Sequence, residues 1–263
     1  MSNVAPPPTT LAIVGATGSN GRLAVAHALD HGLQVRAVNR STRRARRVLG
    51  DHLDDHLDDP NLTLHEADAT DARQLAPVVD GVDAVVLAHG NDTEPESNYR
   101  VIATAVETLP AGTPVSLMSA IAVTQDIPAF SEILEWRRRG ERLLRASALR
   151  HTIIRPGWFD GHSPGDDRAE FQQGDATPLG SMRGVRRRHI AAALVEAVRT
   201  PAAAGRTLEL FSGPGAPIDD WPEAFAALEA DTPDRLDGVH DLAGLPLAEE
   251  PASVREDLRK HSL

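Results

Sequence analysis

Three glycines at intervals of three residues punctuate the stretch VGATGSNGR, directly after the apolar run at 11–14. The run is typical of a buried strand, and apolar residues recur at helical spacing from Leu23 until Gly32. A helix that begins in such a turn directs free backbone N–H groups and its positive dipole end toward the turn, so the turn can bind an anion. The candidate anion-binding residues are Gly15, Thr17, Gly18, Ser19, Asn20 and Gly21.

The end of the next apolar segment indicates which ligand the turn would hold. A strand, a glycine-rich turn and a helix in this order are typical of dinucleotide binding, and a site for NAD has Asp or Glu about 20 residues further along. Here Asn39, Arg40 and Ser41 stand in that place. Because a guanidinium binds a 2′-phosphate and a carboxylate repels it, the sequence predicts NADP(H) in preference to NAD(H), with Arg40 and Ser41 at the phosphate. Arg43 and Arg44 either assist or coat a solvated helix face.

Short apolar segments alternate with helical periodicity along most of the chain. Strands are predicted at 11–16, 33–38, 62–65, 83–88, 115–118, 151–155 and 207–211. Further helices are predicted near 41–49, 71–80, 97–109, 131–148, 189–199 and 219–229. This alternation predicts a doubly wound, Rossmann-type α/β fold, in which helices cover both faces of a parallel sheet and ligands bind at the carboxyl ends of the strands.

The composition along the chain suggests one NAD(P)-binding domain over residues 1–263. We expect a cofactor-binding core at 10–157, a small C-terminal substrate lobe with the late helix and strand at 158–230, and a tail at 231–263. The stretch 158–188 is too polar and irregular for the core and is expected above the ligand edge of the sheet. The acidic, proline-bearing tail is expected to wrap the surface or to be partly mobile.

The segment GATGSNGRLAVAHALDHGLQVRAVNRS resembles the start of the atypical short-chain dehydrogenase/reductase proteins. This NAD(P)H-binding group includes the NmrA-like regulators and the flavin or biliverdin reductases. Later segments are similar to the same family in the same order, so the resemblance covers about residues 10–215. These segments are HEADATD, GVDAVVLAHG, LRASALRHTIIRPGWF and RRRHIAAALVEAVRTPAAAGRTLELFSG.

The resemblance assigns further cofactor contacts. It implies that Asp68 and Ala69 meet the adenine and that Ser119 stands at the end of a strand near the nicotinamide. The residues that it places beside the ribose and the nicotinamide end are Ala88, His89 and Gly90.

The proton donor of the wider superfamily is missing. Its reductases use a tyrosine four residues before a lysine, and the family register places these two positions on Ile133 and Arg137. The chain has a single tyrosine, Tyr99, and a single lysine, Lys260, so no such pair exists anywhere. Arg137 could hold the ribose, but a guanidinium stays protonated and cannot relay a proton. The resemblance therefore allows hydride transfer with a proton from water or another group, or cofactor binding without turnover.

Four other side chains are weak candidates for the catalytic acid or for orienting a substrate. His89 and His162 titrate in the right range to donate a proton, although exposed loop histidines are common. Ser119 could orient a substrate oxygen or bond the nearby backbone. Tyr99 is expected to be a packing residue at the edge of the site rather than the acid. The catalytic residues are thus unknown from the sequence.

Two charged clusters are interpreted as surface features. His52 and His56, in DHLDDHLDD at 51–59, have a spacing that could share a metal on a helix face, but no third ligand is evident. The sequence predicts no metal site. The segment RGVRRRH at 183–189 is expected to be a solvated rim, although one of its arginines could reach an anionic substrate or cofactor phosphate.

Composition restricts the environment and the partners. The 263 residues include no cysteine, which removes disulfides and thiolate chemistry, and the formal net charge is −11. The acidic balance argues against nucleic acid or anionic membrane as a partner. The opening residues MSNVAPPPTT lack the basic start and apolar stretch of a signal peptide, so a cytoplasmic location is expected.

These features together predict an NADP(H)-dependent reductase that transfers hydride to a small carbonyl, quinone or flavin-like acceptor without a Tyr/Lys acid pair. The alternative is a non-catalytic, NmrA-like sensor of the NADP(H) balance, which would pass its state to a protein partner. A non-redox isomerase or epimerase would need the same missing acid.

Overall fold

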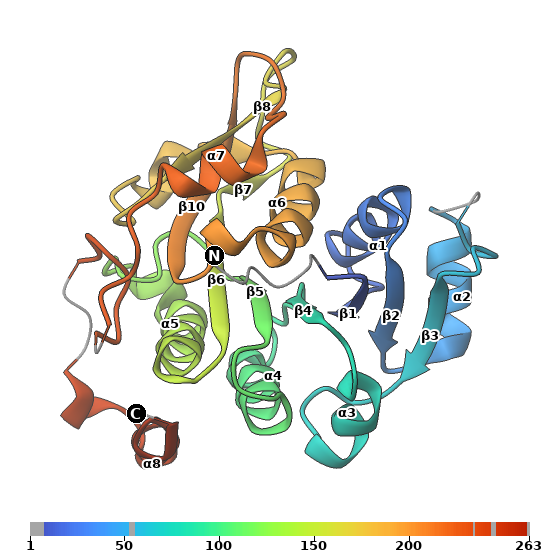
Figure 1. Ribbon diagram of the computed structural model, residues 1–263. Helices are drawn as coiled ribbons and strands as arrows, with labels where there is room; N and C mark the ends of the chain where they lie inside the picture. Colours follow the sequence, from blue (N-terminus) through green and yellow to red (C-terminus); the bar gives the residue numbers. More distant parts are fainter. Residues whose placement is uncertain (1–7, 53–55, 234, 243–245, 262–263) are drawn as a thin grey trace, which may run out of the picture.

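A computed structural model describes residues 8–52, 56–233, 235–242 and 246–261. Its main feature is an eight-stranded sheet in the order β3-β2-β1-β4-β5-β6-β10-β8 (Figure 1). All neighbouring strands are parallel except β10 and β8, which are antiparallel. The strands are β1 (Thr10–Val14), β2 (Gln34–Asn39), β3 (Leu62–Glu66), β4 (Ala84–Leu87), β5 (Pro114–Met118), β6 (Arg150–Pro156), β8 (Arg168–Gln172) and β10 (Arg206–Gly213). The first six strands have the doubly wound order, so the predicted fold class is confirmed.

Helices cover both faces of the sheet (Figure 1). One face carries α1 (Gly21–Asp30), α2 (Thr42–Gly50) and α6 (Arg187–Arg199). The other carries α3 (Ala72–Val79), α4 (Pro95–Thr108) and α5 (Ser131–Ala146), with α8 (Ala252–His261) packed outside α5. Alternate residues of β1 divide between the two cores: Leu11 and Ile13 face α1 and α6, whereas Ala12 and Val14 face the opposite layer. All four are buried, as expected for a strand inside a parallel sheet.

The stretch 158–188 is more regular than the sequence predicts. It contains β7 (Trp158–Phe159) paired with β9 (Gly184–Val185), and the edge strand β8. Phe171 of β8 packs on Phe225 of α7 (Trp221–Ala226), with ring centroids 5.3 Å apart. The expectation of an irregular loop was wrong because a short edge strand buries only alternate residues, so its polar residues resemble those of a loop.

The tail from residue 231 onward is anchored to the domain, in agreement with a surface wrap. Val254 and Leu258 of α8 enter the core beside α4 and α5. Glu250 is buried and binds arginines of α5. The short helical turns are η1 (Pro128–Phe130), η2 (Leu179–Ser181), η3 (Pro201–Ala203) and η4 (Leu247–Glu249).

Within the described ranges, every helix is too short or too polar to cross a bilayer. Residues 1–7, on which the expectation about the start of the chain depends, lie outside the described part.

Candidate functional site

A cavity of about 510 Å³ lies at the carboxyl ends of β1, β2 and β4, between the glycine turn and the start of α4. This is the edge of the sheet at which doubly wound proteins bind their ligands. The predicted cofactor residues that line it are Gly15, Thr17, Gly18, Arg40, Ser41, Asp68, Ala69, Ala88, His89 and Gly90. The structure thus brings together predicted residues from four separate segments of the chain.

The glycine turn has a shape that side chains would fill. Gly15 has φ +81°, and a Cβ there would come within 2.9 Å of the His89 backbone. A Cβ at Gly21 would lie 2.1 Å from the Gly15 carbonyl oxygen, so this glycine lets α1 start against the turn. A Cβ at Gly18 would meet only the Gly15 oxygen, at 3.1 Å, and Gly18 lines the cavity. This cradle fits the phosphates of a dinucleotide.

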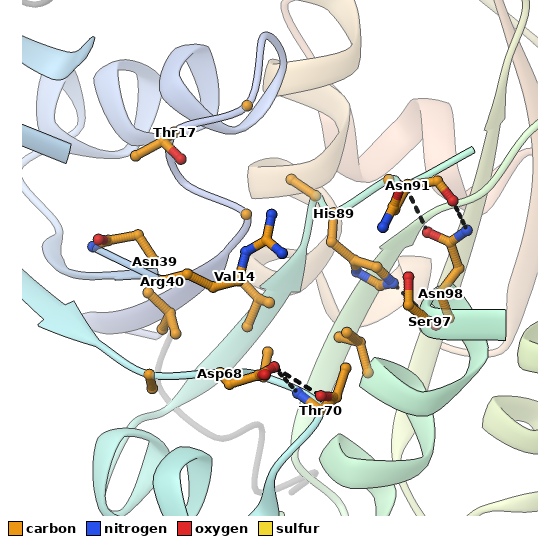
Figure 2. A pocket seen from close by; sticks show the side chains of 18 of the residues that line it. Val14, Thr17, Asn39, Arg40, Asp68, Thr70, His89, Asn91, Ser97 and Asn98 are labelled. Carbon is orange, nitrogen blue, oxygen red and sulfur yellow. Dashed lines mark hydrogen bonds between the residues drawn. The ribbon is translucent and has the colours of Figure 1, made fainter. Parts of the chain in front are cut away.

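Three arginines are among the residues that line the cavity. Figure 2 shows the Arg40 side chain reaching into the cavity from the end of β2. Arg44 of α2 and Arg100 of α4 complete the group. Asn39, which stands where an NAD site has its acid, is instead engaged with the backbone, since it donates to the Ala37 and His65 carbonyls. The place at which an NAD site has its carboxylate is therefore taken by an amide.

Asp68 provides the one carboxylate predicted at the adenine. Its Oδ1 accepts hydrogen bonds from the Thr70 N–H (2.9 Å) and hydroxyl (2.8 Å), and these lower the pKa of the carboxyl (Figure 2). The charges of Arg40 and Arg100 lower it further. Asp68 is thus held ionised beside the arginines.

The loop after β4 is held by a residue that the sequence analysis missed. Asn98 of α4 is buried, accepts a hydrogen bond from the Asn91 N–H (2.9 Å) and donates to the Asn91 carbonyl (2.9 Å) (Figure 2). Both line the cavity, as does Arg100. The sequence could have indicated these residues, because the helix that follows β4 begins at the ligand edge of the sheet and polar residues at its start face the site.

His89 lies in the same loop and is neutral. Its Nε2 is 3.1 Å from the Asn98 carbonyl oxygen, which can only accept, so Nε2 carries the proton. Burial lowers the pKa of the ring to about 4, against the effect of the Asn98 bond and with help from the Arg137 charge. The buried Nδ1 has no protein partner. His89 can therefore accept a hydrogen bond, but it holds no second proton to donate near neutral pH.

The remaining predicted cofactor residues are not among those that line this cavity. Ser119 directly follows β5, and its buried hydroxyl has no partner. Asn20 donates to the sulfur of Met118, the residue before Ser119, and its own Oδ1 is buried without a partner. Arg137 of α5 binds Asp92 at 3.0 Å, beside Gly90. Polar groups thus remain unsatisfied where the resemblance places the nicotinamide.

Tyr99 points away from the cavity. Its hydroxyl donates to Asp257 of α8 at 2.8 Å, and its ring contacts Trp136 with centroids 5.7 Å apart. Burial and the Asp257 carboxylate raise the pKa of the phenol well above its usual range. The structure therefore gives Tyr99 the packing role that the sequence favours, although in the layer between α4, α5 and α8.

The arginines of the segment 183–189 pair with carboxylates of the stretch 158–188. Arg183 binds Glu170 and Arg188 binds Asp167. Arg187 differs, because it binds Asp160 (2.8 Å) and also donates to the Ser19 hydroxyl (2.6 Å). One arginine of this segment thus reaches the glycine turn at Ser19. His162 has a buried Nδ1 without a partner, and no hydrogen bond places it at the cavity.

The histidines of DHLDDHLDD do not form a metal site within the described residues. His56 binds Asp30 at 3.0 Å, and residues 53–55 of this stretch lie outside the described part. His52 is exposed.

Several solved structures share this fold. An oxidoreductase from Lactococcus lactis is 17% identical, with a TM-score of 0.65 over 83% of this chain and 96% of that chain. The anaerobillin reductase ChuY from Escherichia coli is 21% identical, with a TM-score of 0.62 over 80% and 100%. A Rossmann-fold NAD(P)-binding family protein from Shigella flexneri is 19% identical, with a TM-score of 0.57 over 81% and 97%. At these identities the similarity establishes the fold.

The sequence itself matches a family model. No curated protein matches the chain with significance. The family described as NAD(P)H-binding matches residues 15–201, which is more than half of the chain and includes the glycine turn, the arginine group and the loop after β4. The chain therefore belongs to the NAD(P)H-binding family, as its glycine turn predicts.

Proposed function

We propose that the chain is an NADPH-dependent oxidoreductase that reduces a small carbonyl, quinone or flavin-like acceptor. The observation that supports this most strongly is that Arg40, Arg44 and Arg100 line the same cavity as the glycine cradle. Three guanidinium groups there suit a 2′-phosphate better than a bare ribose diol. The reductase class is favoured by the family, whose cofactor carries a hydride.

The residues present suggest how such a site would work. When bound, the nicotinamide supplies the hydride. Arg137, at the loop after β4, would hold the ribose and add positive charge, while Ser119 and Asn20 offer hydrogen bonds to the amide or to the acceptor. His89 is neutral and would accept a hydrogen bond through Nδ1. Since none of these groups is a tuned acid, the proton for the reduced acceptor would come from water.

Arg40→Ala should lower the preference for NADPH over NADH about tenfold to a hundredfold. The reason is the loss of charge-assisted hydrogen bonding to the phosphate that contributes about 1.5 to 3 kcal/mol in total. Dissociation constants for both cofactors, measured by calorimetry, give the ratio. Arg47→Ala is the matched control, because Arg47 is an exposed residue of the same helix region and does not line the cavity. An unchanged ratio in Arg40→Ala would mean that another residue binds the phosphate.

Tyr99→Phe should slow turnover by less than about tenfold, because lost acid catalysis costs about 10²- to 10⁴-fold and this phenol is engaged with Asp257 away from the cavity. Rates at saturating NADPH between about pH 5.5 and 9 give the comparison. A thousandfold loss with unchanged NADPH affinity would identify Tyr99 as the acid.

The class of function is tested by a screen for NADPH oxidation with flavins, quinones and small aldehydes and ketones. A reductase oxidises NADPH with at least one of them. The lack of a tuned acid near His89 and Ser119 keeps the NADP(H) sensor as the second candidate. A sensor would bind NADPH but would not oxidise it in the presence of any of these acceptors. It would also bind a protein partner differently in the NADPH and NADP⁺ states.

A further inference from the structure

Two histidines and a glutamate meet at the ends of α1 and α6 that lie away from the cavity. The two helices pack side by side (Figure 1). His27 and His31 stand one turn apart at the end of α1, and Glu196 faces them from the last turns of α6. Their ligand atoms all lie within 4.8 Å of one another, and no other group of three such side chains converges in this way among the described residues.

We propose that His27, His31 and Glu196 bind a divalent cation of the zinc type. Zinc bonds of about 2.0 to 2.2 Å in a tetrahedron place neighbouring ligand atoms about 3.3 to 3.6 Å apart. The Glu196 Oε1 atom lies 3.1 Å from His27 Nε2 and 3.8 Å from His31 Nε2, which brackets that separation. Two imidazole nitrogens and a carboxylate oxygen are a ligand set that zinc accepts, with water in the fourth position.

A hydrogen bond from His31 Nδ1 to the backbone orients its ring so that Nε2 is available to a metal. His31 Nδ1 lies 2.7 Å from the backbone oxygen of His27, which can only accept, so Nδ1 carries the proton. In the neutral ring, Nε2 then directs a lone pair toward the Glu196 carboxylate. A lone pair facing an anionic oxygen at 3.8 Å is unfavourable, and either a cation between the two atoms or a proton on Nε2 removes the repulsion. A donor bond from the second ring nitrogen to a backbone carbonyl is the usual support of a metal-binding histidine.

Glu196 is a buried carboxylate whose Oε1 lies within hydrogen-bond distance of both His27 and Arg199. Arg199 Nη1 lies 2.6 Å from the same Oε1 and fixes the carboxylate toward the histidines. Its positive charge also opposes a cation, so we expect a weaker site than one closed by four protein ligands.

The proposed cation would join α1 to α6. The first of these helices begins in the glycine turn, and the first turn of the second reaches Ser19 through Arg187. Since a ligand that binds only the folded state raises its stability, zinc should raise the melting temperature. The effect is independent of the proposed reductase activity, because neither histidine lines the cavity.

The test uses the metal-free full chain without an added histidine tag, titrated with zinc chloride by calorimetry and followed by thermal unfolding. We expect one zinc per chain and a higher melting temperature. His27→Ala and His31→Ala should each weaken zinc binding about 100-fold or more, since even outer-shell changes cost about 10- to 100-fold. Glu196→Gln should do the same. His56→Ala removes a different histidine–carboxylate pair and should bind zinc as the native chain does.

Circular dichroism of each variant checks that the fold is intact. The proposal is wrong if the native chain binds no zinc, or if the zinc affinity is the same in His27→Ala, His31→Ala and the native chain. A loss of stability in His27→Ala, with no effect of zinc on the native chain, would mean that the cluster is a histidine–glutamate ion pair only.

Discussion

Arg155→Met is expected to lower the free energy of unfolding by about 3 to 5 kcal/mol. Arg155 of β6 is fully buried and makes bidentate contacts with two carboxylates. It donates to Asp241 at 2.7 Å through each Nη, and to Glu141 at 3.0 Å from Nε and 2.6 Å from Nη2. Glu209 lies 3.3 Å from Nη1. Methionine would leave these carboxylates buried without their shared cation, and that is the costly arrangement.

The pH dependence of this loss follows from the same contacts. Burial raises the pKa of Glu209 to about 7 even with Arg155 present, and without the arginine the carboxyls should hold protons more strongly. In the native chain, the hydrogen bonds and charge of Arg155 lower the pKa of Asp241 although burial opposes this, so Asp241 loses its stabilising charge only below the range from pH 8 to 5. In the variant, the carboxyls whose pKa is raised take up protons within that range, and this relieves their unpaired buried charge. The difference between variant and native chain should therefore be largest near pH 8 and shrink toward pH 5.

Urea unfolding of both proteins across that range measures the effect. Arg150→Met is the matched control, because Arg150 is an exposed arginine of the same strand whose guanidinium donates to the Gly112 carbonyl. Its loss should stay below about 1 kcal/mol. A loss of the same size in both variants, or one that does not depend on pH in Arg155→Met, would contradict this account of the buried cluster.

The sheet and the cofactor edge could be predicted because their signals are local. Each of the first six strands is a short apolar run, and the glycine spacing of VGATGSNGR is a property of one turn. Arg40 follows β2 directly, so its place at the cavity follows from the strand alone. Gly15, Thr17 and Gly18 of the glycine turn and the predicted residues after β4 line the cavity because parallel strands end at one edge, whereas Ser19, Asn20 and Gly21 are not among its lining residues.

The charged clusters could not be predicted because they join distant segments. Arg155 and Asp241 are 86 residues apart in the chain, and each alone reads as a surface charge. Charge patterning predicts that such residues are exposed to solvent, and they can be buried only in a fold that pairs them. His27 and His31 have the same spacing as His52 and His56, and the sequence could not distinguish the two pairs. The difference is Glu196, which the packing of α6 on α1 supplies.

Asn98 and Arg100 were missed for a related reason. Both lie in SNYR at the start of α4, where Tyr99 attracted attention as the only phenol. Consecutive side chains of a helix point in different directions, so the neighbours of a buried tyrosine do not share its surroundings. Asn98 and Arg100 line the cavity, whereas Tyr99 faces Trp136 and Asp257.

Gly18→Val should weaken NADPH binding by a factor of about 10² to 10⁴ while leaving the fold intact. Gly18 is exposed, and its φ lies outside the left-handed region, so the backbone tolerates a side chain. A Cβ there would lie 3.1 Å from the Gly15 oxygen and otherwise enter the cavity, where a pyrophosphate would approach the N–H groups of the turn. The loss of two such hydrogen bonds, at about 1.5 to 3 kcal/mol each, gives the expected factor. Calorimetric titration with NADPH measures it, and thermal unfolding without cofactor should differ little from the native chain.

Gly180→Val is the matched control, because a Cβ at Gly180 meets nothing within 4 Å and Gly180 does not line the cavity. Equal NADPH affinity in Gly18→Val and Gly180→Val would place the phosphates elsewhere and remove the glycine turn from the cofactor site.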